Sequence, residues 1–401
     1  MPHRPLILTA LLTLGLAAPQ ATAAVTGGGG PGVPATATVQ GFRVTAPDGW
    51  VFQGELTLPP GARAGQNFPT VLLVHGSGPN DMNETVSAEE ARSPGGSANF
   101  LTIARRLNAA GFAVARFNKR GVTGVGPRTV PPEEMTGVGY TPTGIAGDAL
   151  RILQHVRRQP QVDPSRVFLL GHSEGTDIVS KLAADHRELV RGVVAIGVSG
   201  DSSKDSLRLQ IVDNQVGYAR KFDRDRDGVL SAAEVNAVPG DLRVWLRLWE
   251  AMGLIGPAGR QYRMTPALDP SGRQEVEISG QLRAFLAGYF DRTYPDFLFM
   301  GPHWGAYMRD AERFGFTTTL LPRYPGPVLM MNGDRDDQTP LGGAVRAYEA
   351  VRRSGNADVT LKVYPGTGHT LAPLRDGVTT LGPMSEQALT DLTLWLKARA
   401  R

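Results

Sequence analysis

The sequence has 401 residues, of which 41% are hydrophobic and 20% are charged, enough to bury a sizeable core in one or two domains. The net charge is +4, from 42 basic and 38 acidic residues, and no polybasic run is present. We therefore expect no nucleic-acid partner. The absence of cysteine excludes disulfides and a thiolate nucleophile.

Residues 1–23 predict a secretory signal peptide. Arg4 supplies the positive charge, and the apolar stretch 6–18 falls short of the ~20 residues that span a membrane. Ala21-Thr22-Ala23 fits the small-x-small rule for cleavage. Residues 24–38, with four consecutive glycines, predict a flexible linker. We expect a secreted or periplasmic protein with no membrane span after signal cleavage.

Strand and helix patterns alternate along residues 39–200 and 323–401. Two alternating runs around Asp48-Gly49 predict an N-terminal antiparallel hairpin over 41–58. After it, the alternation predicts a mostly parallel, doubly wound sheet. The expected strands are 70–74, 112–117, 167–170, 190–198, 328–331 and 359–364, and the expected helices are 99–110, 147–158, 176–185, 343–353 and 385–399. Residues 201–322 interrupt the pattern and predict a mainly helical, aromatic-rich inserted cap.

A buried strand runs directly into Gly171-His172-Ser173-Glu174-Gly175. A strand that ends in G-x-S-x-G predicts a nucleophile elbow, the tight strand-to-helix turn that exposes a serine hydroxyl. Ser173 is then the candidate nucleophile. Because a free hydroxyl attacks poorly at neutral pH, an acid and a histidine are expected to follow it along the chain.

Three histidines follow Ser173, and His369 is the best candidate for the general base. His186 comes too early for an acid-bearing strand to intervene, and His303 lies in the aromatic insertion, where it packs or lines the site. His369 stands in a glycine-rich loop just after an alternating strand, a place from which an imidazole can reach the serine.

The acid is expected among three aspartates that follow the strand 328–331. A G-x-x-D pattern with a proline four residues further on selects Asp336, with Asp334 as second choice and Asp337 as a turn or solvent-exposed residue. The oxyanion is expected to bind two backbone N–H groups, those of Glu174 and of Ser77 in the His75-Gly76-Ser77-Gly78-Pro79 loop.

With these motifs in order, the sequence resembles the α/β-hydrolase superfamily over about 41–200 and 324–401. It is most similar to bacterial secreted serine esterases with an H-G-S-G-P loop, relatives of dienelactone hydrolase and of oligopeptidase catalytic domains. The resemblance implies the α/β-hydrolase fold and a serine hydrolase that cleaves carboxylic esters or thioesters through an acyl-enzyme. One departure is Asn118, where such proteins often have the aspartate of D-x-R-G; it puts a local ion pair in doubt.

Residues 223–234 of the insertion fit the twelve-residue EF-hand calcium loop, with Gly228 at the sharp turn. The expected ligands are Asp223, Asp225, Asp227, the Val229 carbonyl, Ser231 and both oxygens of Glu234. Asp269-Pro270-Ser271-Gly272 lacks the ligand spacing, so no convincing partner loop is found and we expect a solitary calcium site. A structural Ca²⁺ that braces the insertion is predicted.

The predicted substrate is a small-molecule ester, and catalysis itself needs no cofactor. Two alternatives remain. A serine peptidase related to the oligopeptidases ranks second, because no large N-terminal gating domain is present. A non-catalytic, calcium-dependent binding protein on the same fold is disfavoured by the complete series Ser173, Asp336 and His369. The sequence does not predict the ester or the oligomeric state.

Overall fold

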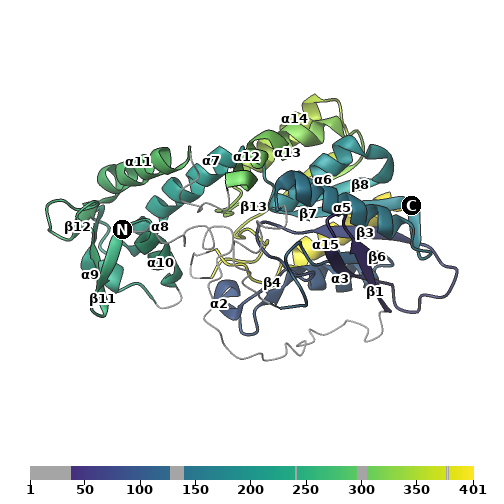
Figure 1. The fold of residues 1–401 in the computed structure, drawn as a ribbon, viewed down its shortest axis with the longest axis horizontal. Coiled ribbons are helices and arrows are strands. Elements are labelled where there is room, and N and C mark those ends of the chain that lie inside the picture. Colours follow the sequence, from purple (N-terminus) through teal and green to yellow (C-terminus); the bar gives the residue numbers. More distant parts are fainter. Residues whose placement is uncertain (1–37, 127–139, 240–241, 296–304, 376, 378) are drawn as a thin grey trace. The chain divides into compact units, whose positions relative to one another are not determined.

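The computed structural model describes residues 38–126, 140–239, 242–295, 305–375, 377 and 379–401 (Figure 1). The predicted signal peptide 1–23, linker residues 24–37 and His303-Trp304 lie outside this part of the chain. The described residues form two compact units, a core unit of 38–202 with 310–401 and an insertion unit within 203–309.

The core unit is built on an eight-stranded sheet with the order β1-β2-β6-β3-β7-β8-β13-β14. Neighbouring strands from β6 to β14 run parallel, whereas the β1–β2 and β2–β6 pairs are antiparallel. The strands are β1 (Val39–Thr45), β2 (Val51–Thr57), β3 (Phe68–Val74), β6 (Ala113–Phe117), β7 (Val162–His172), β8 (Gly192–Ile196), β13 (Val328–Gly333) and β14 (Val359–Tyr364).

Helices pack against both faces of this sheet (Figure 1). The longer ones are α3 (Asn99–Ala109), α5 (Pro142–Arg157), α6 (Glu174–Asp185), α14 (Leu341–Arg353) and α15 (Glu386–Arg399). The shorter elements are β4 (Thr85–Val86), α2 (Ala88–Ala91), β5 (Ser97–Ala98), α12 (Gly305–Phe314), α13 (Thr317–Leu320) and two 3-10 turns, Arg187–Leu189 and Leu321–Arg323.

Alternate residues of the central strands explain the two covered faces. Phe168 and Leu170 of β7 belong to one apolar cluster with residues of α3 and α15, and Leu169 between them is equally buried. Since successive side chains of a strand point to opposite faces, a strand buried throughout needs helices on both sides. The apolar run before the elbow is therefore the inner strand that the sequence predicts.

Two boundaries differ from the sequence prediction. Helix α5 begins at Pro142 and not near 147, because the Thr141 side chain accepts a hydrogen bond from the Gly144 N–H and caps the helix. The insertion unit ends at Arg309, before the predicted 322. Thr317 and Thr318 already return to the core unit, where they hydrogen-bond to the backbone of Ser199 and Gly200.

The insertion unit mixes helices with two small sheets that the sequence analysis did not predict. Strands β9 and β12 form one antiparallel pair, and β10 and β11 form the other. Its elements are α7 (Ser203–Arg208), a π-helical turn (Leu209–Asp213), α8 (Asn214–Phe222), β9 (Val229–Ser231), α9 (Ala232–Asn236), α10 (Val244–Ala251), β10 (Ile255–Ala258), β11 (Gln261–Met264), β12 (Glu275–Glu277), a second π-helical turn (Ile278–Leu282) and α11 (Arg283–Thr293).

Candidate active site

Ser173 lies in the tight turn between β7 and α6. Its φ is +55° and its ψ is −125°, a conformation that non-glycine residues rarely adopt and that costs of order 1–3 kcal/mol. A Cβ at Gly171 would collide with the Gly175 carbonyl, and one at Gly175 with the Val74 carbonyl. The two glycines of the G-x-S-x-G pattern are therefore required by close backbone packing, and the turn has the geometry of the predicted nucleophile elbow.

The structure pairs His369 with Asp336, the acid selected from the sequence. The imidazole Nδ1 lies 2.9 and 3.0 Å from the two carboxylate oxygens, and both residues are buried. Asp334 accepts instead from the Gly366 N–H, and Asp337 from the Thr379 hydroxyl. Asp336, and neither of its neighbours, is thus placed to hold the imidazole.

The environment of Asp336 keeps its carboxylate ionised. Burial alone would raise the pKa of Asp336, but the charge and hydrogen bond of His369 and the backbone N–H groups of Thr339 and Gln338 lower it below its usual value. The Thr339 hydroxyl adds a further bond of 2.9 Å. A carboxylate fixed in this way favours the His369 tautomer that has its proton on Nδ1 and leaves Nε2 free to accept one.

The His369 ring lies at the elbow. Its centroid is 4.8 Å from that of His172, the residue directly before Ser173. A Cβ at Gly197, directly after β8, would lie 3.1 Å from ring atoms of His369. Ile196, the last residue of β8, accepts a hydrogen bond from the Ser173 N–H through its carbonyl. The end of β8 therefore touches both the nucleophile turn and the imidazole.

The H-G-S-G-P loop passes close to the nucleophile. A Cβ at Gly76 would lie 3.0 Å from the Ser173 Cβ and 3.6 Å from its Oγ, so a larger residue would fill the space beside the hydroxyl. Among the described residues, none accepts a hydrogen bond from the Ser77 N–H. This N–H and that of Glu174, the first residue of α6, remain the candidate oxyanion donors.

Four residues that the sequence analysis did not single out hold this loop. Asn80 donates to the carbonyls of Gly76 and Ser77, and the Tyr140 hydroxyl bonds to the backbone of Gly78. The Lys119 ammonium donates to the Gly76 carbonyl, and Glu84 accepts from the Gly76 N–H. In the sequence, the motif that contains Lys119 stands out only through Asn118. The Asn118 side chain accepts a hydrogen bond from the Met82 N–H and donates one to the Gly124 carbonyl.

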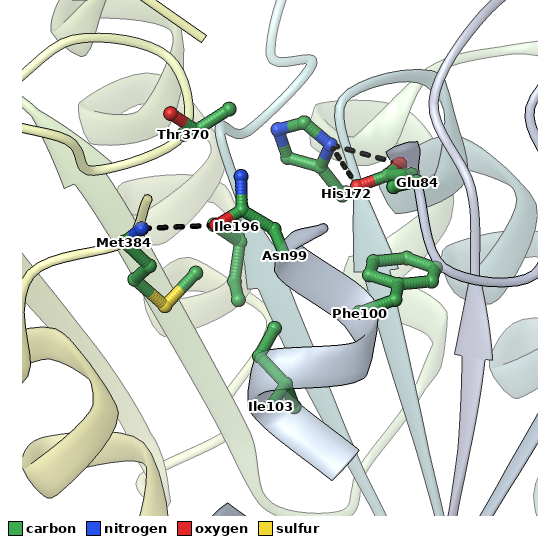
Figure 2. Close-up of a pocket in the computed structure, with 8 residues that line it drawn as sticks. All are labelled: Glu84, Asn99, Phe100, Ile103, His172, Ile196, Thr370 and Met384. Carbon is green, nitrogen blue, oxygen red and sulfur yellow. Dashed lines mark hydrogen bonds and ion pairs between the residues drawn. The ribbon is translucent and has the colours of Figure 1, made fainter. Parts of the chain in front are cut away.

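Figure 2 shows a second histidine–carboxylate pair, His172 with Glu84. The His172 ring lies next to that of His369, with 4.8 Å between the ring centroids. The His172 Nδ1 is 3.0 Å from the Glu84 carboxylate, and both side chains are largely buried. Burial alone would raise the pKa of Glu84, but His172 outweighs it and holds this pKa below its usual value. Burial alone would lower the pKa of His172, but Glu84 outweighs it and holds this pKa above its usual value. The pair lines a cavity of about 10 Å³, room for roughly one water. Its lining residues are Glu84, Asn99, Phe100, Ile103, His172, Ile196, Thr370 and Met384.

His75 makes the core unit sensitive to acid. It packs against Phe100 and Phe117, and burial lowers its pKa to about 4, with nearby Lys119 adding to the effect and Glu84 opposing it. The unfolded chain takes up this proton below about pH 6.5, whereas the folded protein resists it until about pH 4. The neutral imidazole therefore contributes stability that is lost as the pH falls from 6.5 to 4, by up to about 3 kcal/mol.

We predict that His75→Gln reduces this loss. The measurement is the free energy of unfolding from urea titrations at pH 7.5 and pH 4.5, compared between wild type and variant. The variant has no titrating ring, so its unfolding free energy should fall less over this interval. An equal fall in both proteins would contradict the assignment.

In the insertion unit, the predicted calcium loop brings three carboxylates together. Ligand oxygens of Asp223, Asp225 and Asp227 lie within 4.8 Å of one another. Gly228 adopts a φ of +84°, as the turn requires. The Glu234 carboxylate accepts from the Ser231 N–H and hydroxyl, forming the capping box of α9. The three aspartates fit an oxygen-preferring cation. Glu234, predicted as a ligand with both oxygens, lies outside this group of carboxylates, and both of its oxygens accept hydrogen bonds from Arg224 and Ser231 of the loop itself.

The predicted calcium loop has a backbone partner that was not predicted from the sequence. Strand β9 of the calcium loop pairs with β12, so that Leu230 lies opposite Val276. Asp269 precedes Val276 by the same spacing that separates Asp223 from Leu230. The Asp269 carboxylate accepts four hydrogen bonds, from the backbone N–H groups of residues 271, 272 and 274 and from the Ser271 hydroxyl. The partner segment pairs through its backbone and lacks the spacing of metal ligands, so a ligand pattern in the sequence does not indicate it.

Comparison with known proteins identifies the class. A model of the alpha/beta hydrolase fold family matches residues 69–375, so the chain belongs to this family. The predicted α/β-hydrolase fold, with its mostly parallel sheet, is confirmed.

Among the described residues, no helix is long and apolar enough to cross a membrane.

Individual similar proteins do not by themselves determine which bond this chain cleaves. Esterase EstD of Thermotoga maritima is 36% identical over 144 residues, which are 36% of this chain and 29% of that protein. The crystal structure of hypothetical protein PA2218 from Pseudomonas aeruginosa has a TM-score of 0.50 and 14% identity over 95% of this chain and 98% of its own, which shows the shared fold. Porphyromonas gingivalis dipeptidyl peptidase 4 has a TM-score of 0.48 and 12% identity, over 90% of this chain and 35% of its own. The chain thus spans less than two thirds of the esterase and of this peptidase.

Proposed function

We propose that the protein is a serine hydrolase that cleaves carboxylic ester or thioester bonds through an acyl-enzyme. The observation behind the proposal is the buried His369–Asp336 pair beside the elbow of Ser173. The partial identity to an esterase supports the choice of ester chemistry.

The chemistry follows from these positions. Ser173 Oγ attacks the carbonyl carbon while His369 Nε2 takes its proton, and ionised Asp336 stabilises the imidazolium. The resulting oxyanion accepts from the N–H groups of Ser77 and Glu174, each worth roughly 3 kcal/mol in the transition state. His369 then gives its proton to the leaving alcohol or thiol. In the second half, water donates a proton to His369 and attacks the acyl-enzyme, which releases the acid and restores Ser173.

A substrate panel tests the proposal. We would assay p-nitrophenyl esters from acetate to palmitate, an acetylthioester and alanine p-nitroanilide with the wild-type protein. The proposal expects turnover of at least one ester or thioester and little of the anilide. Turnover of the anilide alone would instead indicate a peptidase. If nothing is cleaved and the serine is unreactive, a binding protein becomes the better account.

We also propose that residues 223–234 bind one structural Ca²⁺ that braces the insertion unit. Asp223, Asp225, Asp227, the Val229 carbonyl, Ser231 and Glu234 would supply the oxygens, and the catalytic steps above do not involve the ion. The partner segment at Asp269 lacks comparable ligands, so one ion per chain is expected.

Calcium should therefore raise the unfolding temperature of the wild-type protein, and Asp223→Ala should abolish the increase. An ion at a hundred times its Kd stabilises by about 2.7 kcal/mol. The measurement is thermal unfolding with calcium and with chelator. Asp269→Ala is the matched control: it lowers stability by removing loop hydrogen bonds but keeps the calcium response. The metal proposal fails if calcium leaves the wild-type transition unchanged.

Export through the signal peptide remains a proposal as well. Expression in a bacterial host with N-terminal sequencing of the exported protein tests it. A mature chain that begins at Ala24 is expected. A protein that keeps residues 1–23 and stays in the cytoplasm would contradict it.

A further inference from the structure

We propose that Lys119 is a positioning residue for the oxyanion hole: it holds and polarises the Gly76–Ser77 peptide and ties it to the start of α6. The inference rests on the proposed function, because it assigns a role within that reaction. It starts from a contact between a buried ammonium group and one backbone carbonyl.

The contact is to the peptide that bears a candidate oxyanion donor. The Lys119 Nζ lies 2.6 Å from the Gly76 carbonyl oxygen, and the nitrogen of the same peptide group is the Ser77 N–H. In a trans peptide the C=O and N–H point in opposite directions within one plane. A donor that fixes the carbonyl therefore also fixes the direction of the N–H on the other side.

The charge of Lys119 also strengthens that N–H as a donor. A hydrogen bond to a carbonyl polarises the whole peptide group, and a charged donor in a low-dielectric site does so most. The Lys119 side chain is only 3% exposed, so water screens little of this effect. Asn80 donates to the same oxygen at 2.9 Å and completes its coordination. The Ser77 N–H is thus prepared for a developing negative charge before any substrate arrives.

The same ammonium reaches the second candidate donor. Its Nζ is 2.7 Å from the Glu174 carboxylate, and Glu174 is the residue whose backbone N–H begins α6. One cation therefore links the H-G-S-G-P loop to the nucleophile turn. Because an oxyanion hole works only when both donors converge on one point, the bridge sets a distance that catalysis depends on.

The surroundings keep Lys119 charged. Burial alone would lower its pKa, but Glu174 and Tyr140 raise it above the usual value. A protonated lysine is no nucleophile, so a covalent role is excluded. Its place behind the loop, bonded to protein atoms on two sides, fits positioning and not substrate contact.

The test uses three variants of the full-length protein with an ester found in the panel. Lys119→Met removes the charge and takes the ammonium group away from the buried Glu174 carboxylate, which can impair folding. The double variant Lys119→Met/Glu174→Gln removes both charges and keeps the backbone donors. Lys181→Met is the matched control, because Lys181 pairs with Asp185 at a more exposed position further along α6. For each we would measure kcat, KM, the Ki of a trifluoromethyl ketone and the unfolding temperature.

We expect the double variant to fold and to lose about 10- to 100-fold in kcat, less than the loss of a whole donor. KM should change by less than about threefold, since the oxyanion forms only after binding. The trifluoromethyl ketone, whose adduct carries an oxyanion, should weaken by the same factor as kcat. The Lys181 control should match the wild type in all these values.

A folded double variant with wild-type kcat and wild-type ketone affinity would overturn the inference. So would a rise in KM alone, which would indicate substrate binding. Failure of the proposed function looks different: the wild-type protein itself would then hydrolyse no ester and bind no ketone.

Discussion

Replacing Ser173 with alanine is expected to lower kcat for an ester by about 10⁶-fold, as loss of the nucleophile does in serine hydrolases. The variant keeps the backbone of the elbow, because alanine has a Cβ like serine and the collisions are avoided at Gly171 and Gly175. Its unfolding temperature should therefore stay close to that of the wild type. The measurement is single-substrate kinetics together with thermal unfolding.

Ser180→Ala is the control for this result. Ser180 lies in α6, the helix that begins directly after Ser173, and its hydroxyl donates to the Thr176 carbonyl. Replacing Ser180 with alanine also removes one hydroxyl group, but this hydroxyl bonds to the Thr176 carbonyl and not to His369. We therefore expect kcat to stay at the wild-type value. Retention of activity in the Ser173 variant would place the nucleophile elsewhere in the chain.

The second large effect is expected at the acid. Asp336→Asn should lower kcat by about 10⁴-fold, because an amide cannot hold the required tautomer or stabilise an imidazolium. Asp336 contacts His369 Nδ1 with both carboxylate oxygens, and the Thr339 hydroxyl, 3.2 Å from the same nitrogen, carries no charge that could stabilise an imidazolium in its place. The loss should appear in kcat and in kcat/KM alike.

The neighbouring aspartates give two matched controls. Asp334→Asn and Asp337→Asn make the same change within three residues, and their carboxylates bond to Gly366 and Thr379 instead of His369. Both should keep kcat within about tenfold. If Asp334→Asn were the damaging change and Asp336→Asn were harmless, the assignment of the acid would have to be reversed.

The elbow and its partners could be predicted from sequence because packing and topology leave a trace in it. No side chain fits at Gly171 or Gly175, so the backbone path dictates the residues themselves. Asp336 and His369 each follow a parallel strand, and the carboxyl ends of parallel strands meet at one edge of the sheet. A pattern that combines both features is specific.

The residues behind the oxyanion loop could not be predicted in the same way. Lys119 and Glu84 contact the backbone of Gly76, and backbone groups are the same at every residue. Such contacts leave no partner pattern to recognise. Charged residues are also expected at the surface, so burial of Lys119 and Glu84 is visible only in three dimensions.

The insertion unit was predicted less well for a related reason. Side-chain ligands indicate the predicted calcium loop in the sequence, whereas the partner strand β12 joins this loop through backbone hydrogen bonds. Asp269 and Val276 have the same spacing as Asp223 and Leu230, which is enough for the two strands to pair. This pairing does not require metal ligands in the partner segment. A criterion based on ligands therefore detects one loop of the pair and passes over the other.

Labelling with a fluorophosphonate probe shows whether Ser173 is an activated nucleophile. The probe reacts only with a serine that a working base activates, so it reports on the assembled site without knowledge of the substrate. We expect one adduct per folded wild-type chain, located by peptide mass spectrometry on Ser173 and absent from Ser173→Ala. A folded wild-type protein that stays unlabelled, or that is labelled at another residue, would contradict it.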